Sequence, residues 1–184
     1  MSHEVKYWER TGLPLGTERY RRYLDLFGLD RASCRGLAVC DYGCGPFGGV
    51  LSILTDVRQG YPVDILADFY NTWRLSPWPI LDVPDGRAEV PDASCDAAFC
   101  LNMLDHMPNA EIVVRDIERI LRPHGRLFAF VHVGRDRVKA HHPVTQRSVM
   151  ALFSAWRVGT LSVGADAPNQ EPSLTALWFT AERA

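Results

Sequence analysis

The chain has 184 residues, of which 47% are hydrophobic, and its formal net charge is −2. This length supports one domain with a sizeable core, and the charge provides no basic surface typical of nucleic-acid binding. Five cysteines without a Cys-x-x-Cys pair predict buried thiols in a reducing compartment. The sequence has no apolar run of about 18 residues and no signal-peptide core. We therefore expect one cytoplasmic domain, residues 1–184, that contacts neither membrane nor nucleic acid.

The first predicted element is a helix over residues 17–27. Its aromatic and leucine residues recur at helical spacing, and Gly28 is suited to end it. The arginines at 19, 21 and 22 are interpreted as a solvated face.

The next stretch, residues 39–50, reads V-C-D-Y-G-C-G-P-F-G-G-V. It predicts a buried strand, a tight glycine turn and a helix from residue 48 or 49 to about 59. Such a turn lets backbone N–H groups approach a polar or anionic ligand. Gly43, Gly45 and Gly48 match the GxGxxG fingerprint of dinucleotide-binding proteins, so the glycines alone leave an NAD-dependent oxidoreductase open.

A second strand is predicted over residues 61–67, with an acidic residue for ribose hydroxyls near its end. Asp64 lies 64 − 43 = 21 residues after the first glycine, and we prefer it to Asp68 for this role. Residues 80–83 form a candidate third strand between prolines.

The remaining elements alternate between strands and helices. In the helix over 109–121, Val113, Ile117 and Ile120 face the core, while Asp116 and Arg119 are expected to face water. The other predicted elements are strands at 95–101, 126–133, 156–163 and 174–181, and a helix from Thr145 to about 155.

Three ordered motifs carry a family resemblance. Asp41, two residues before the first glycine, gives an Asp-x-Gly-x-Gly pattern that resembles the first motif of class I S-adenosylmethionine-dependent methyltransferases. Residues 92–102, D-A-S-C-D-A-A-F-C-L-N, are similar to that family's fourth strand, and residues 103–106 follow where it often has a leucine and a histidine. Residues 112–125, ending in L-R-P-H-G, resemble its next helix and turn.

The resemblance implies a Rossmann-like α/β fold in a single domain. Its sheet would be mostly parallel and seven-stranded, with the last strand inserted antiparallel and helices on both faces. Residues 1–30 would form a helical cover over the cleft. With no room for a separate lid domain, a second subunit, as in a homodimer, is one way to complete the acceptor pocket.

The implied cofactor is S-adenosyl-L-methionine. Its predicted contacts are Asp41, Gly43, Cys44, Gly45, Pro46, Asp64, Glu89, Leu101 and Asn102. Glu89 is either a cofactor contact or a loop carboxylate, because residues 87–91 depart from the family pattern.

His106 and Asp105 are the candidate catalytic residues, since both follow a strand whose carboxyl end faces the ligand crevice. Histidine exchanges protons near neutral pH, so His106 could remove a proton from an acceptor; alternatively, it packs beside the next helix. The pair His141-His142 has no companions at ligand spacing, so no metal site is expected.

The predicted function is methyl transfer from S-adenosylmethionine to a small-molecule acceptor. Two alternatives stay open. One is a binding protein for this cofactor that does not methylate, which the departures from the family pattern at 87–91 and at His124 keep open, and the other is an NAD-dependent oxidoreductase. The sequence names neither the acceptor nor the atom that is methylated.

Overall fold

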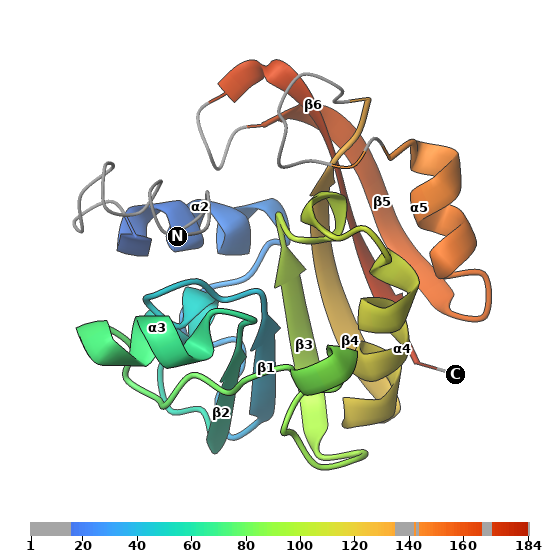
Figure 1. Ribbon diagram of the computed structural model, residues 1–184. Coiled ribbons are helices and arrows are strands. Elements are labelled where there is room, and N and C mark those ends of the chain that lie inside the picture. The colour runs from blue at the N-terminus through green and yellow to red at the C-terminus, as the bar shows by residue number, and fades with distance from the viewer. Residues whose placement is uncertain (1–15, 135–141, 143, 167–170, 184) are drawn as a thin grey trace.

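A mixed sheet with strand order β2-β1-β3-β4-β6-β5 forms the centre of the fold (Figure 1). The computed structural model describes residues 16–134, 142, 144–166 and 171–183. The first four strands in that order are parallel, and β6 runs antiparallel to both β4 and β5. The strands in chain order are β1 (Ala38–Tyr42), β2 (Gln59–Val63), β3 (Cys95–Leu101), β4 (Leu121–His132), β5 (Arg157–Asp166) and β6 (Glu171–Glu182).

Helices cover both faces of this sheet, as predicted. The helices are α2 (Gly16–Leu26), α3 (Ala67–Trp73), α4 (Ala110–Ile120) and α5 (Gln146–Leu152), with 3₁₀ turns η2 (Gly49–Ser52), η3 (Pro84–Gly86) and η4 (Leu104–His106). Figure 1 shows α2 at the end of the sheet to which the arrowheads of β1 and β3 point. None of the helices in the described part of the chain is both long and apolar enough to cross a bilayer.

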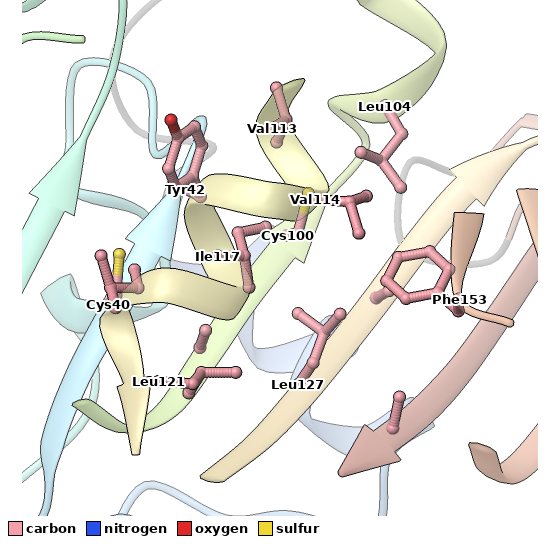
Figure 2. Close-up of a cluster of buried hydrophobic side chains, with 14 of the residues drawn as sticks. Cys40, Tyr42, Cys100, Leu104, Val113, Val114, Ile117, Leu121, Leu127 and Phe153 are labelled. Carbon is pink, nitrogen blue, oxygen red and sulfur yellow. The ribbon is translucent and has the colours of Figure 1, made fainter. Parts of the chain in front are cut away.

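The larger core lies between the sheet and the helices α4 and α5. Val113 and Ile117 of α4 belong to one buried cluster with Cys40 and Cys100 of the central strands (Figure 2). Phe153, directly after α5, closes this core against β6, where its ring lies 4.9 Å from that of Phe179. Parallel strands covered on both faces are expected to be apolar, and β3 is apolar and buried at every position except Asp96, which pairs with Arg58 and Arg122.

The opposite face is covered by α2 and η2. Tyr23 and Leu24 of α2 are buried against Val39 and Phe130, and the Tyr23 and Phe130 rings meet edge to face at 5.0 Å. The predicted limits of this helix, 17–27, agree with α2 to within one residue at each end.

The expected helix over residues 48–59 is wrong. Only the short η2 turn forms, because Gly48 and Gly49 have φ of 78° and 61°, and Asp56 also has positive φ at 57°. Left-handed residues at both ends prevent a continuous α-helix. The chain after α3 packs beside this region instead, since a Cβ at Gly48 would contact Ser76 and one at Gly60 would contact Trp78.

The sheet has six strands within the described residues, where seven were expected. Residues 80–83 form no strand; Leu81 makes a single parallel bridge to Val63. Prolines at 79 and 84 limit the pairing, since each lacks a backbone donor. The second strand also ends earlier than predicted, at Val63, and residue 67 begins α3.

Candidate functional site

The glycine turn between β1 and η2 is fixed to the end of β2. Gly43 and Gly45 have φ of 81° and 64°, a backbone conformation that favours glycine. The N–H groups of Gly43 and Cys44 both donate to the Val63 carbonyl, at 2.8 and 3.1 Å. The turn therefore sits at the carboxyl ends of two neighbouring parallel strands, where open α/β sheets bind ligands.

Asp41, on β1, is buried against this turn and stabilises it. Its side chain is only 2% exposed, and its Oδ2 accepts a 2.6 Å hydrogen bond from the Val50 N–H. A Cβ at Gly49 would overlap the Asp41 carboxylate, so that residue must be glycine for the turn to close. Burial raises the pKa of Asp41 to about 7, and the nearby charge of Asp64 also raises it.

Asp64 lies directly after β2 and faces the glycine turn. Its Oδ2 accepts a 2.9 Å hydrogen bond from the Gly45 N–H, and its Oδ1 accepts one of 2.9 Å from the Leu66 N–H. A carboxylate is an acceptor-only group with two lone pairs on each oxygen, the type of group that accepts hydrogen bonds from hydroxyl donors. The next residue, Ile65, is 68% exposed, which leaves an apolar surface beside the carboxylate.

Cys44 and Pro46 are buried within the turn. The Cys44 carbonyl accepts a 3.2 Å hydrogen bond from the Tyr20 hydroxyl, so α2 is tied directly to the turn. Burial raises the pKa of the Cys44 thiol well above its usual range, and the charge of Asp64 raises it further. A neutral buried thiol is a structural group and not a nucleophile.

The segment after β3 meets the glycine turn. Leu101 is buried, and Asn102, with φ of 59°, donates its N–H to the Phe130 carbonyl at 2.8 Å. The Asn102 Oδ1 is buried and accepts no hydrogen bond from the described residues. The Met103 side chain lies over Gly43, because a Cβ on that glycine would be 2.5 Å from the Met103 Cγ.

The two catalytic candidates lie in η4 and differ in exposure. His106 is half-buried, whereas Asp105 has no exposed surface and faces His132, the last residue of β4. The Asp105 Oδ2 is 3.6 Å from the His132 Nδ1. Contact between the Asp105 carboxylate and an acceptor would require this turn to open. The pairing with His132 was not predicted, although parallel strand ends meet at one edge and bring such residues together.

The methyltransferase domain family matches residues 40–129 of this chain. A ubiquinone biosynthesis O-methyltransferase of Xylella fastidiosa (strain M23) is 36% identical over 130 residues, which cover 62% of this chain and 51% of that protein. The resemblance to class I S-adenosylmethionine-dependent methyltransferases is confirmed. The chain spans about half the length of the curated relatives it matches.

Solved structures of methyltransferases share the fold. A SAM dependent methyltransferase from Aquifex aeolicus superposes with a TM-score of 0.69 and 17% identity, covering 100% of both chains. The 1,6-didemethyltoxoflavin-N1-methyltransferase of Burkholderia thailandensis, solved with S-adenosylhomocysteine, gives a TM-score of 0.65 and 17% identity, and covers 100% of this chain and 84% of its own. At this level of identity the two structures show a shared fold, and S-adenosylmethionine is the cofactor that the family resemblance implies.

The side chains of Asp64 and Asn102 fit the hydrogen-bonding groups of S-adenosylmethionine. Asp64 presents an acceptor carboxylate directly after β2, and the Asn102 Oδ1 is a buried acceptor with no hydrogen-bond donor among the described residues. S-adenosylmethionine carries donors of both required kinds, in its ribose hydroxyls and its ammonium group. Leaving a buried acceptor unsatisfied costs about 1–3 kcal/mol, so a bound donor at Asn102 would be favourable.

Glu89 lies between two residues whose backbone is hydrogen-bonded to side chains of α4. The expectation that Asp116 faces water is wrong: it is 5% exposed and accepts hydrogen bonds from the Tyr42 hydroxyl at 3.0 Å and the Ala88 N–H at 2.8 Å. Arg119, also only partly exposed, donates to Asp116 and to the Val90 carbonyl, both at 2.7 Å. The Glu89 side chain is exposed and makes no hydrogen bond to the described residues, so its role stays a prediction.

No group of three or more histidine, cysteine, aspartate or glutamate side chains within the described ranges has the arrangement of a metal site. His141 lies outside those ranges. Two surface cavities of about 330 and 390 Å³ border α2 and α3, and none of the predicted site residues lines either of them.

Proposed function

We propose that this chain transfers the methyl group of S-adenosylmethionine to a hydroxyl oxygen of a small-molecule acceptor. The observation that carries the proposal is the contact between Asp64 and the glycine turn, at 2.9 Å from the Gly45 N–H, within the segment that matches the methyltransferase domain. The choice of oxygen is supported by the name of the Xylella relative, an O-methyltransferase.

The cofactor contacts follow from the groups at the sheet edge. Asp64 accepts hydrogen bonds from the ribose hydroxyls, and Asn102 accepts one from a donor at the methionine end. Ile65 supplies an exposed apolar surface on which the flat adenine packs. Leu101 lines the approach to the sulfur, while Asp41, Gly43, Cys44 and Pro46 shape the turn. When bound, S-adenosylmethionine supplies an electrophilic methyl group.

The protein's own task is to position the acceptor and to take its proton. Holding an acceptor oxygen in line for displacement supplies much of the rate in a transfer of this kind. A hydroxyl must lose its proton as it is methylated, and His106, half-buried after β3, is the proposed proton acceptor. The N-terminal residues up to 30 would cover the cleft, of which residues 1–15 lie outside the described ranges.

Calorimetric titration tests the cofactor site. Wild-type protein should bind S-adenosylmethionine and S-adenosylhomocysteine, and Asp64→Ala should weaken both by roughly 10- to 100-fold, since it removes hydrogen bonds to a charged group. Asp68→Ala is the matched control, because it removes an exposed carboxylate from the first turn of α3, four residues away. We expect it to bind like the wild type.

Two results would contradict the proposal. A folded wild-type chain that binds neither sulfur compound rejects the cofactor, and tight binding of NADH instead supports an oxidoreductase. Equal losses in Asp64→Ala and Asp68→Ala would reject the assignment of the ribose contact.

The transfer step is measured as S-adenosylhomocysteine formation with phenol and catechol as probe acceptors. His106→Ala should lower the rate by about 100-fold or more, in the range of general base catalysis, while leaving S-adenosylhomocysteine affinity unchanged. A rate unaffected by this substitution would reject His106 as the proton acceptor.

A further inference from the structure

A carboxylate and an imidazole meet in the interior of the fold where β3 and β4 end. Asp105 has 0% and His132 2% of its surface exposed, and the Asp105 Oδ2 lies 3.6 Å from the His132 Nδ1. Burying two ionisable side chains is costly, and it is tolerated where their mutual interaction and other contacts compensate. Such a pair is therefore unlike the exposed ion pairs on the surface of this protein.

The pair is surrounded by contacts that join three segments. The Asp105 carbonyl accepts a 2.6 Å hydrogen bond from the His142 N–H, and the Gly134 N–H donates to the Val144 carbonyl at 2.9 Å. The Phe130 ring meets the His132 ring edge to face at 5.5 Å. The 3₁₀ turn after β3, the end of β4 and residues 142 and 144 are thus held close together.

The segment at residues 102–106, which includes this 3₁₀ turn, carries the groups assigned to the cofactor and the acceptor. Asn102 lies three residues before Asp105, and His106 directly follows it. Asp105 and His132 expose too little surface to touch either ligand in this arrangement. Whatever they contribute to binding or transfer must pass through the position of this turn.

We propose that Asp105 and His132 are positioning residues that hold the turn at residues 102–106 against the glycine turn, so that Asn102 can accept a hydrogen bond from the cofactor. This inference rests on the proposed function. It replaces direct contact by Asp105 with an indirect role, and it adds His132, which the sequence did not single out.

The test is calorimetric binding of S-adenosylhomocysteine to a set of folded variants. His132→Leu removes the imidazole at similar volume and should weaken binding about tenfold. His132→Asn places an amide nitrogen near the position of Nδ1, so binding should return to within about threefold of the wild type. The matched control is His124→Leu, the same substitution on the same strand at an exposed histidine that pairs with Glu182 at 3.0 Å. It should leave the affinity unchanged.

A double-mutant cycle shows whether the pair acts through Asn102. If it does, Asn102→Ala and His132→Leu each weaken binding about tenfold, and the double variant is little worse than either single variant. Independent effects would instead multiply to about 100-fold and overturn the proposal. Unchanged affinity in His132→Leu would overturn it as well.

Two further measurements keep the outcome readable. If His132→Leu does not fold, Asp105→Asn, which keeps the side-chain shape, takes its place in the cycle with the same expectations. Absence of binding by the wild type rejects the proposed function itself. In that event the unfolding free energies of the Asp105→Asn and His132→Asn variants and their double variant still show whether the two side chains are coupled, and an uncoupled pair rejects the inference.

Discussion

Two buried aspartates each hold a segment that carries predicted cofactor contacts, and they do so with different electrostatics. Asp116 on α4 holds the segment at residues 84–92, and Asp41 on β1 holds the glycine turn. Both are close to fully buried, and both accept a hydrogen bond from the backbone of the segment that they hold.

The difference lies in the compensating charge. Asp116 pairs with the Arg119 guanidinium at 2.7 Å and also accepts a hydrogen bond from the Tyr42 hydroxyl. Asp41 accepts one hydrogen bond, from Val50, and has no cationic partner within the described residues. The segment at 84–92 is therefore held by the ion pair of Asp116 and Arg119. Asp41 instead holds the glycine turn through one carboxyl group, so the stabilisation that it provides depends on whether that group is protonated.

The largest expected effect comes from breaking the compensated pair. Asp116→Ala removes the buried carboxylate partner of Arg119, which keeps its ion pair with the exposed Asp92, and it leaves the Tyr42 hydroxyl and the Ala88 N–H unpaired. Removing one partner of a buried ion pair costs about 3–5 kcal/mol, and we expect a loss of that size in the free energy of unfolding, measured in urea.

Glu111→Ala is the matched control for this variant. Glu111 lies on the same helix and pairs with Arg115, but both side chains are more than half exposed. The free energy of unfolding should change by less than about 0.5 kcal/mol. Similar losses of unfolding free energy in Asp116→Ala and Glu111→Ala would show that the buried pair does not stabilise the segment at 84–92.

Much of the fold was predictable because local pattern and tertiary structure agree. β3 has the predicted limits, residues 95–101, since a short run that is apolar except for Asp96 is typical of a strand buried on both faces. The antiparallel insertion of β6 between β4 and β5 was implied by the family resemblance and is confirmed.

The predictions from sequence failed where the structure depends on the conformation of single backbone residues or on a partner far away in the chain. Residues 50–54 have helical apolar spacing, but the left-handed glycines at 48 and 49 end the possibility of a helix there. The burial of Asp116 had a local signal, because it lies three residues after Val113 and four before Ile120 on the core face. The partner of Asp105 had none, since it depends on which strand ends lie side by side.

The second expected effect is a change in pH dependence at Asp41. Its pKa is raised to about 7 from an ordinary value of 3.8. The folded state therefore holds a proton that the unfolded chain releases, so the stabilisation that this proton provides is complete below about pH 4 and is lost as the pH rises to about 7. A shift of this size corresponds to roughly 4 kcal/mol at most.

Asp41→Asn removes this titration and keeps an oxygen that accepts from Val50. The difference in unfolding free energy between the variant and the wild type should shift in favour of the variant between pH 4 and pH 7, and should be constant above about pH 8. Denaturant unfolding at several pH values measures it. A difference that does not vary with pH would show that Asp41 is ionised in the folded state throughout this range.

The smallest of the three effects concerns the space around Asp41. Gly49 and Gly28 both have positive φ, at 61° and 66°, so an alanine at either position has the same backbone strain of about 1 kcal/mol. A Cβ at Gly28 meets nothing within 4 Å, whereas one at Gly49 overlaps the Asp41 carboxylate. Gly49→Ala should therefore cost about 2 kcal/mol more than Gly28→Ala, because the carboxylate must leave its hydrogen bond to Val50. In the Asp41→Asn background the overlap persists and the same excess is expected, whereas Asp41→Ala opens the space and should reduce it to near zero. An excess that persists in Asp41→Ala would show that the crowding at Gly49 comes from the turn itself and not from the aspartate beneath it.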